Sequence, residues 1–401
     1  MTTPAQTTTL ASGRIIELDA LRGLAVIGIV WMNVYVFALP AQGYYNPDAA
    51  AVHTPFDRLV WAISFVFIED KFRTLFAMLF GAGCIILFDK GGENPWRAHF
   101  ARMAVLFAIG LAHSILFASN DILRAYALAG LALPFIAMLS SRALIAVAVG
   151  LVAVHIGGGI IAFGSGFYDW SQGRLHSDLV VFADRNFGTD PAAIEFSLQQ
   201  GREGFEERLL RRSANVPAQI ATISRSVPIN LAAMAIGIAL WRERMLAAEW
   251  RTFQLQRVAA LCGVFSVLPL LWLAGWVAEL GFPGIVIGPV SLIVSAPFDT
   301  ALGVAYAALA MALFTRSGAI TLRLAAVGRL SLTNYLMTSV ILSAVFASWG
   351  FGLFGRVSRV EALVLCIVPI AAILLWSPLW VANLGQGPFE RLWRTISRLL
   401  S

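Results

Sequence analysis

The sequence predicts an all-α, polytopic integral membrane protein. Hydrophobic residues make up 59% of the 401 residues, charged residues make up only 13%, and the mean hydropathy is +0.77. Soluble domains carry roughly twice this share of charged residues. Long apolar runs recur along the whole chain, and only a lipid solvent tolerates so much apolar surface. This composition excludes a disordered chain, a coiled coil and an ordinary cytosolic enzyme.

Ten apolar runs are long enough to predict transmembrane helices. They cover residues 21–39, 57–88, 103–119, 122–139, 143–163, 226–241, 256–279, 285–314, 324–347 and 360–382. The second run is too long for one perpendicular span. We therefore expect a bent or interfacial stretch over 57–68, followed by a span that begins at about residue 72. Pro289 and Pro297 predict a kink in the eighth run, because proline removes a backbone N–H from the helix.

The distribution of Lys and Arg predicts that the N- and C-termini are both cytoplasmic. Short loops on the side of the N-terminus hold most of these residues, including Arg14, Lys90 and Arg316. The short loops on the other side hold Arg58, Arg124, Arg356 and Arg359. The sequence thus predicts a multi-pass membrane protein with both termini on the cytoplasmic side. The net charge of +6 is explained by cytoplasmic loops, so no nucleic-acid partner is expected.

One membrane domain with an insertion is the expected organisation. Residues 1–163 form an N-terminal five-span half, 164–225 an extracytoplasmic amphipathic insertion, and 226–401 a C-terminal five-span half. The insertion mixes both signs of charge. Apolar residues at loosely helical spacing over 191–212 predict one or two amphipathic helices on the outer surface.

Several chemistries lack their sequence motifs. Cys84, Cys262 and Cys366 lie in apolar runs without Cys-x-x-Cys spacing, so neither a disulfide framework nor a metal site is predicted. The chain also lacks a Walker A loop, a Rossmann glycine motif, a Gly-x-Ser-x-Gly elbow and a His-Glu-x-x-His motif. ATP-driven transport, dinucleotide redox chemistry and zinc proteolysis are not expected, nor is a permanently bound cofactor.

Ionisable residues at membrane depth give the main functional signal, because burying them in hydrocarbon is costly. In the first run, Asp19 and Arg22 share one helix face, and Asn33 lies three turns further along nearly the same face. The second run contains a charged cluster between apolar flanks, formed by Glu69, Asp70, Lys71 and Arg73. Some of these four side chains must pair with each other or face a cavity.

Two later segments add further polar residues. His113 precedes a short outer turn, and Asp121, Arg124 and Tyr126 follow that turn. A neutral imidazole serves as a general base near pH 7, so His113 is a candidate base. We expect its ring to lie within about one side-chain length of Asp121 or of the Glu69–Arg73 cluster. In the ninth run, Arg329 is a candidate phosphate ligand, whereas Asn334 has the character of a helix-packing residue.

Five segments together resemble the bacterial DUF418 family, also called the YeiB-like membrane proteins. The segments are LDALRGLAVIGIVWMN, KFRTLFAMLFGAG, DILRAYALAGL, VGRLSLTNYLMTS and GQGPFERLWR, in this order along almost the whole chain. The first segment is similar to the opening of the wider transmembrane acyltransferase superfamily, which includes acyltransferase-3 proteins and heparan-glucosaminide N-acetyltransferases. Those enzymes move an acyl group from cytoplasmic acyl-CoA across the membrane to a sugar hydroxyl or amine.

The resemblance implies acyl transfer from acyl-CoA to an extracytoplasmic sugar or a lipid-linked acceptor. Arg22 matches the first-helix arginine of the superfamily, and Asp19 belongs to the same motif. In acyltransferase-3 proteins a histidine lies eleven residues beyond that arginine, but here the position is Asn33, which cannot act as a base. His113 is then the best-placed base, with Glu69, Asp70 or His53 as alternatives. Arg22 and Arg329, helped by Arg97 or Arg102, would bind the phosphates of the donor, and Tyr126 or Asn33 would hydrogen-bond the developing oxyanion.

Two other classes of function fit the same residues. In a transporter or permease, the same charges would form a proton or substrate relay, in which Glu69–Lys71 pairs with Asp121–Arg124. In a non-catalytic cell-envelope protein, the bundle would be a scaffold and 164–225 the contact surface. If the protein is an enzyme, we expect a cytoplasm-facing cavity. If it is a transporter, we expect pseudo-symmetric halves, and if it is a scaffold, we expect locally paired polar residues.

Overall fold

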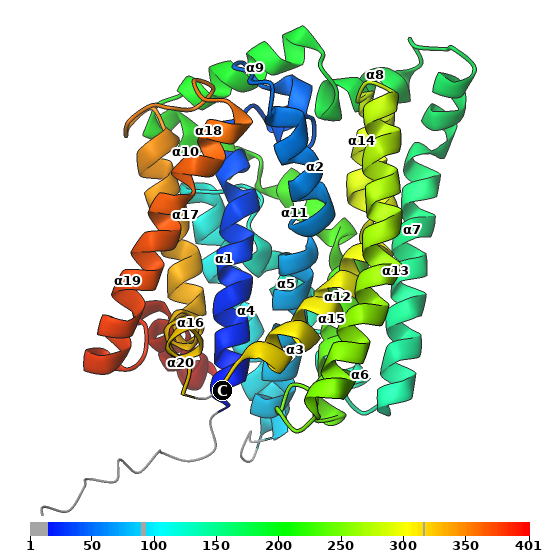
Figure 1. The fold of residues 1–401 in the computed structure, drawn as a ribbon. Coiled ribbons are helices and arrows are strands. Elements are labelled where there is room, and N and C mark those ends of the chain that lie inside the picture. Colours follow the sequence, from blue (N-terminus) through cyan, green and yellow to red (C-terminus); the bar gives the residue numbers. More distant parts are fainter. Residues whose placement is uncertain (1–14, 90–93, 316) are drawn as a thin grey trace, which may run out of the picture.

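The computed structural model describes residues 15–89, 94–315 and 317–401, and within these ranges all regular secondary structure is helical (Figure 1). The predicted all-α class is therefore confirmed. Arg14, Lys90 and Arg316, which contribute to the predicted charge asymmetry, lie outside the described residues.

Seven helical segments in the described ranges are long and apolar enough to cross a membrane. They are α1 (Ile16–Ala38), α2 with α3 (Asp57–Phe67 and Lys71–Asp89), α4 (Pro95–Leu116), α7 (Ser141–Ser171), α13 (Thr252–Glu279), α15 (Ala296–Leu313), and α18 with α19 (Arg359–Leu365 and Ile367–Leu384). An eighth would be the pair α11 (Val216–Arg225) and α12 (Val227–Arg242), which is bent by 51°. A multi-pass membrane protein is thus confirmed.

The number of ten spans stays a prediction, although every one of the ten predicted runs is helical. The fourth run is divided into α5 (Ile122–Gly130) and α6 (Leu133–Ile136), and the ninth into α16 (Ala319–Arg329) and α17 (Ser331–Phe346). These pieces are individually shorter than the roughly 20 residues that a perpendicular span needs.

Both predicted interruptions are present. The second run breaks between α2 and α3, at residues 68–70. In the eighth run, α14 (Gly284–Pro289) passes through one π-helical turn, η3 (Val290–Val294), before α15 begins. Pro289 and Pro297 flank this turn, where their missing N–H groups prevent a regular hydrogen-bond ladder.

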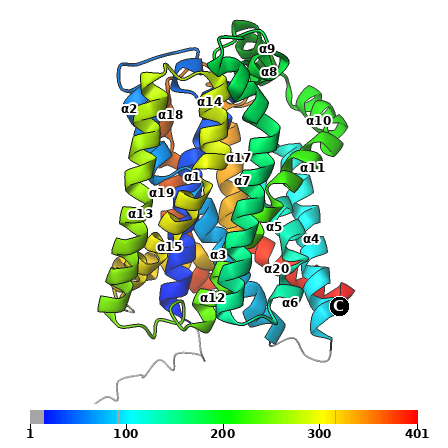
Figure 2. The same ribbon diagram turned by 90° about the vertical axis from the view of Figure 1, so that its right-hand side faces the viewer.

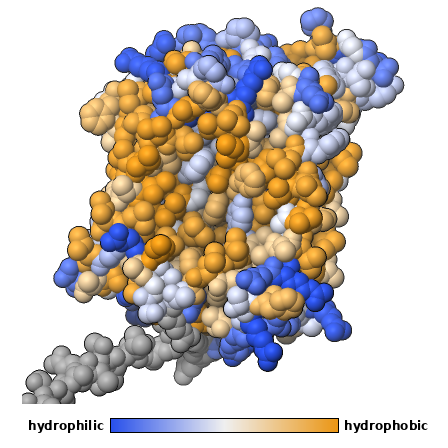
Figure 3. All heavy atoms as spheres, in the orientation of Figure 1, coloured by the Kyte–Doolittle hydropathy of each residue, from blue (hydrophilic) through white to orange (hydrophobic). Residues whose placement is uncertain are grey.

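An apolar belt covers the face of the bundle seen in Figure 3, between two hydrophilic ends. The start of α1 and the C-terminal helix α20 (Pro388–Leu400) lie at one end, and α8 (Asp178–Phe187) and α9 (Pro191–Arg202) lie at the other (Figures 1 and 2). In the most apolar stretch of α1, 67% is buried inside the protein, whereas in that of α7 only 17% is buried. The first helix therefore forms the centre of the bundle, whereas α7 faces outward.

Close approach of α1 and α16 depends on two glycines. A methyl group at Gly23 would lie 2.1 Å from the carbonyl oxygen of Leu324, and one at Gly328 would lie 1.8 Å from that of Asp19. Small residues allow such backbone contact between membrane helices. This crossing holds the N-terminal part of α1 against the end of α16, which carries Arg329.

The C-terminal GQGPFERLWR segment docks a helix onto the bundle. Glu390, in the first turn of α20, accepts hydrogen bonds from the backbone N–H groups of Leu332 and Thr333 at 2.9 and 3.1 Å. These N–H groups begin α17 and have no partner within the helix. The Trp393 indole donates to the Arg102 carbonyl at 2.9 Å, so α20 joins α17 to α4.

Helices at the far end cover the bundle loosely. The expected amphipathic helices within 191–212 are α9 and α10 (Phe205–Ala214), while α7 runs on to Ser171. None of the residues of α9, α10 and α11 is buried.

The fold generates a topology prediction. Reporter fusions before α1 and after α20 should report one and the same side of the membrane, and an insertion near residue 190 should report the opposite side. The positive charges near both termini predict that the shared side is the cytoplasm. Alkaline phosphatase and fluorescent-protein fusions measure this, and an external C-terminus would contradict the depth assigned to every polar residue below.

Candidate functional site

The break between α2 and α3 is held by side chains inside the bundle. Asp70 adopts a left-handed backbone conformation with a φ of 60°, which is strained for a residue other than glycine. The break leaves carbonyl groups of α2 without helical partners. The Lys71 ammonium group donates to the Phe65 carbonyl, and the Tyr306 hydroxyl donates to the Phe67 carbonyl at 2.8 Å. An interrupted span survives in hydrocarbon only with such substitutes.

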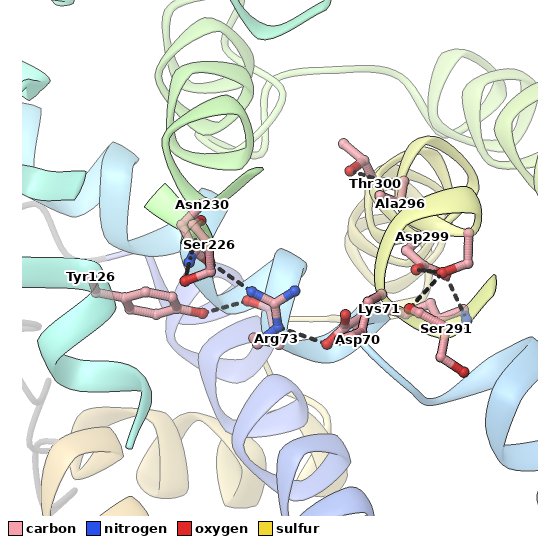
Figure 4. A network of polar contacts seen from close by, with 12 residues as sticks. Asp70, Lys71, Arg73, Tyr126, Ser226, Asn230, Ser291, Ala296, Asp299 and Thr300 are labelled. Carbon is pink, nitrogen blue, oxygen red and sulfur yellow. Dashed lines mark hydrogen bonds and ion pairs between the residues drawn. The ribbon is translucent and has the colours of Figure 1, made fainter. Parts of the chain in front are cut away.

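Lys71 also joins this break to the interruption before α15. Its Nζ lies 2.7 Å from Asp299 Oδ1, and the two side chains are 1% and 3% exposed. Ser295 Oγ donates to Asp299 Oδ2 at 2.7 Å (Figure 4). The ammonium group thus points across to α15, which brings a carboxylate from far along the chain.

Arg73 connects the same break to the bend between α11 and α12. The guanidinium pairs with Asp70 at 2.7 Å and donates to Asn230 Oδ1 at 2.8 Å. Asn230 in turn donates to the Ser226 carbonyl, at the bend (Figure 4). Asp70 and Arg73 keep 24% and 23% of their side-chain surface accessible, so they border space that is not filled by packing. Three interrupted helices therefore meet in one polar network.

A second cluster lies where α4 ends and α5 begins. His113 Nδ1 lies 2.6 Å from Asp121 Oδ2, and both side chains are at most 2% exposed. An ionised carboxylate only accepts hydrogen bonds, so beside it Nδ1 is the donor, and in the neutral imidazole Nε2 keeps its lone pair. Nε2 is buried and has no hydrogen-bond partner. The expectation that His113 lies beside Asp121 is confirmed.

Asp121 is fixed from several sides. Its Oδ1 accepts from the Arg124 backbone N–H at 3.0 Å as the N-cap of α5, and its Oδ2 accepts from the Tyr335 hydroxyl at 3.3 Å. A methyl group at Gly110 would lie 2.5 Å from Asp121 Oδ1, so glycine lets α5 begin this close to α4. The carboxylate is thereby oriented toward His113.

The placement of Arg124 in a short outer loop is wrong, because its side chain is fully buried. Its Nη1 donates to Gln219 of α11 at 2.9 Å and its Nη2 to the Ser119 carbonyl at 2.6 Å. Helix α11 covers the turn and takes the place of solvent. The Nε of Arg124 lies 3.9 Å from Asp121 Oδ1 and has no hydrogen-bond partner.

Tyr126 lies between the two clusters. Its hydroxyl donates to the Arg73 carbonyl at 2.5 Å, and its ring packs on Phe76 and Phe80. The proton expected to stabilise an oxyanion is therefore engaged elsewhere. The predicted residues thus form two clusters, one around Arg73 and one around His113, rather than a single pocket.

The remaining predicted residues lie at other depths. Asp19 and Arg22 form an ion pair at 3.1 Å, and an Nη2 of Arg22 lies against Gly83 of α3. Asn33 is half-buried, about 16 Å further along α1 at 1.5 Å per residue. Asn334 donates to the Val327 carbonyl and to Ser377 Oγ and accepts from the Trp376 indole, so its amide joins neighbouring helices.

Known proteins are similar to this chain over almost its whole length. The family model "Protein of unknown function (DUF418)" matches residues 240–399. The uncharacterized protein YeiB of Escherichia coli (strain K12) is 30% identical over 397 residues, which cover 96% of both chains. The chain belongs to the DUF418 (YeiB-like) family. The uncharacterized protein YxaH of Bacillus subtilis (strain 168) is 27% identical over 417 residues, covering 98% of this chain and 96% of that protein. No solved structure matches the chain.

Sequence reasoning missed three polar residues of this DUF418 protein. Asp299 is a lone acid within a long apolar run, a pattern that indicates a paired or functional residue. Asn230 gave no signal beyond being an amide at membrane depth. Arg359, expected in a short outer loop, is the first residue of α18, and only 1% of the residue is exposed.

No metal-binding group stands out in the part of the DUF418 chain that the structure describes. Clusters of three or more His, Cys, Asp and Glu side chains close enough to share an ion do not occur there.

The Lys71–Asp299 pair gives a stability prediction. Lys71→Met or Asp299→Asn alone should lower the free energy of unfolding by about 3–5 kcal/mol, because each leaves a buried charge unpaired. The double variant should lose clearly less than the sum of the two. Denaturant titration in detergent measures this. The matched control is the exposed Arg58–Asp48 pair, for which Arg58→Gln should cost about 0–1 kcal/mol. Strictly additive losses at Lys71 and Asp299 would refute the coupling.

Proposed function

We propose that this DUF418 protein is a membrane-embedded acyltransferase of the bacterial plasma membrane, with His113 as its general base. The observation that carries the proposal is the buried His113–Asp121 pair with an unpartnered Nε2. A carboxylate on Nδ1 holds the imidazole in the tautomer whose other nitrogen accepts a proton, and it stabilises the imidazolium that forms. The similarity to the acyltransferase superfamily at the first helix supports the same chemistry.

The proposed step transfers an acyl group from acyl-CoA to the hydroxyl of a sugar or lipid acceptor. His113 Nε2 takes the hydroxyl proton while the oxygen attacks the thioester carbonyl. The new C–O bond forms, the C–S bond breaks, and the CoA thiolate leaves and takes the proton back from the imidazolium. The Arg124 Nε–H, buried and without a partner beside Asp121, would stabilise the oxyanion.

The donor would enter from the end of the bundle that carries α20. Arg22, Arg329 and Arg102 lie on helices that meet there, and Nη1 of Arg102 is buried without a hydrogen-bond partner. Arg102 and His113 are both on α4, and 11 residues at 1.5 Å per residue separate them by about 16 Å. If the arginines hold the phosphates of the donor, its thioester must reach His113 on a long, flexible arm, as in acyl-CoA.

The test is acyl transfer by protein reconstituted in lipid. Radiolabelled acetyl-CoA is supplied with a membrane and envelope extract as the acceptor source, and labelled product and released CoA are both measured. His113→Gln and Asp121→Asn should each lower the rate at least about 100-fold, the usual contribution of a general base.

His99→Gln provides the matched control for His113→Gln. His99 is also a buried histidine of α4, but its Nε2 bonds the Gly130 carbonyl rather than a carboxylate. We expect this variant to keep most of the activity. A rate in His113→Gln equal to that in His99→Gln would remove His113 from the mechanism, and no CoA release by the unaltered protein would refute the proposed function.

The meeting of three interrupted helices supports a transporter as the second candidate. Discontinuous spans that meet near the bilayer midplane often form substrate sites in transporters. That function would place the essential residues at Lys71, Asp299 and Arg73 rather than at His113. Loss of function in Asp299→Asn with an unaffected His113→Gln would favour transport.

A further inference from the structure

Arg359, at the start of α18, is one of the most deeply buried side chains of the protein. Its Nη2 donates to the carbonyls of Gly43 and Tyr44, at 2.5 and 3.2 Å. Its guanidinium carbon lies 4.4 Å from the centre of the Tyr35 ring. The two carbonyls belong to the short helix η1 (Ala41–Tyr44), which covers the guanidinium at the end of α1.

These contacts leave the positive charge incompletely satisfied. Nε and Nη1 of Arg359 are buried and have no hydrogen-bond partner. Among the described residues, Arg359 forms no ion pair, although a guanidinium stays charged at any ordinary pH. A cation–π contact and two carbonyls offset only part of the cost of burying a charge.

The neighbouring groups add donors rather than a counter-ion. The Tyr35 hydroxyl lies beside Arg359 and Ser64, but it is buried and forms no hydrogen bond of ordinary geometry with either. Asp57 acts on Arg359 from a distance, while its oxygens accept from Thr54 and from the Val360 backbone N–H. Burial raises the pKa of the Tyr44 phenol well above its usual range, so that hydroxyl also keeps its proton.

Glu69 is the nearest candidate for an internal counter-ion. It is 4% exposed, and its charge acts on Arg359 without an ion pair between the two side chains. The described residues give the Glu69 carboxylate no hydrogen bond or ion pair either. A buried carboxylate and a buried guanidinium thus act on each other without forming an ion pair.

We propose that Arg359 and the Tyr35 hydroxyl bind an oxyanion, the carboxylate or phosphate group of a ligand that enters under η1. Guanidinium groups hold carboxylates and phosphates through charge-assisted hydrogen bonds, and the free Nε–H, Nη1–H and Tyr35 O–H supply the donors. The anion belongs either to a small solute or to a lipid headgroup. This site is separate from the His113–Asp121 pair and stands whether or not the protein transfers acyl groups.

The role of Glu69 makes the proposal testable. If Arg359 binds an external anion, the Glu69 charge opposes that anion, and Glu69→Gln should strengthen binding several-fold. If Glu69 is the true partner of Arg359 and the site is only structural, the same substitution creates no anion site and only destabilises the protein.

The experiment uses the full chain in nanodiscs of phosphatidylcholine. Tryptophan fluorescence is followed while sodium acetate or sodium phosphate is added at constant ionic strength against chloride; Trp31, which donates to Ser64 Oγ at 3.1 Å, is a reporter near the site. A second set of nanodiscs contains phosphatidylglycerol. A saturable response to acetate or phosphate identifies a soluble ligand, and a response only to phosphatidylglycerol identifies a headgroup.

Variants connect the response to the site. Arg359→Gln should weaken the response at least about 10-fold, and Tyr35→Phe should weaken it while retaining the guanidinium. Arg58→Gln, which removes an exposed arginine paired with Asp48, should leave it unchanged. The proposal is overturned if the unaltered protein responds to none of the three probes, or if Glu69→Gln weakens the response. Because Glu69→Gln and Tyr35→Phe keep the arginine, they decide the question even if Arg359→Gln does not fold.

Discussion

The structure depends on satisfying the backbone groups that are freed where membrane helices are interrupted. Hydrocarbon offers no hydrogen bonds, so each interruption needs polar partners from the protein itself. The Lys71 ammonium group meets this need at the end of α2 and also pairs with Asp299 beside the π-helical turn. One side chain therefore stabilises two interruptions.

The two polar clusters use charge in different ways. Around Lys71 and Arg73, both cations have a carboxylate partner. Asp299 and Asn230 reach them from other helices, an arrangement that fixes helices relative to one another. Around His113, the carboxylate is held by donors on three sides while one ring nitrogen stays unused. A buried group with unused bonding capacity is costly, which is why we assign chemistry to the second cluster and stability to the first.

Helices outside the central bundle control access to these clusters. Helix α11 has no buried residue, yet its Gln219 closes over Arg124 beside the His113–Asp121 pair. At the same end, η1 closes over Arg359. Loosely packed segments such as α11 are the parts of a protein that open most easily. The η1 segment is packed more firmly, because Gln42 and Gly43 are buried and Gln42 donates to the Arg185 carbonyl.

The sequence by itself determined that this is a membrane protein of all-helical class. It also determined the two interrupted runs and the proximity of His113 to Asp121. These properties follow from composition, from proline and charge within apolar runs, and from a separation of only eight residues across one turn. Only the tertiary structure decided that Lys71 pairs with Asp299, that Arg73 reaches Asn230 across 157 residues, and that Arg124 and Arg359 are buried. Helix periodicity fixes which face a side chain occupies, but the helix that this face meets depends on the packing of the whole bundle.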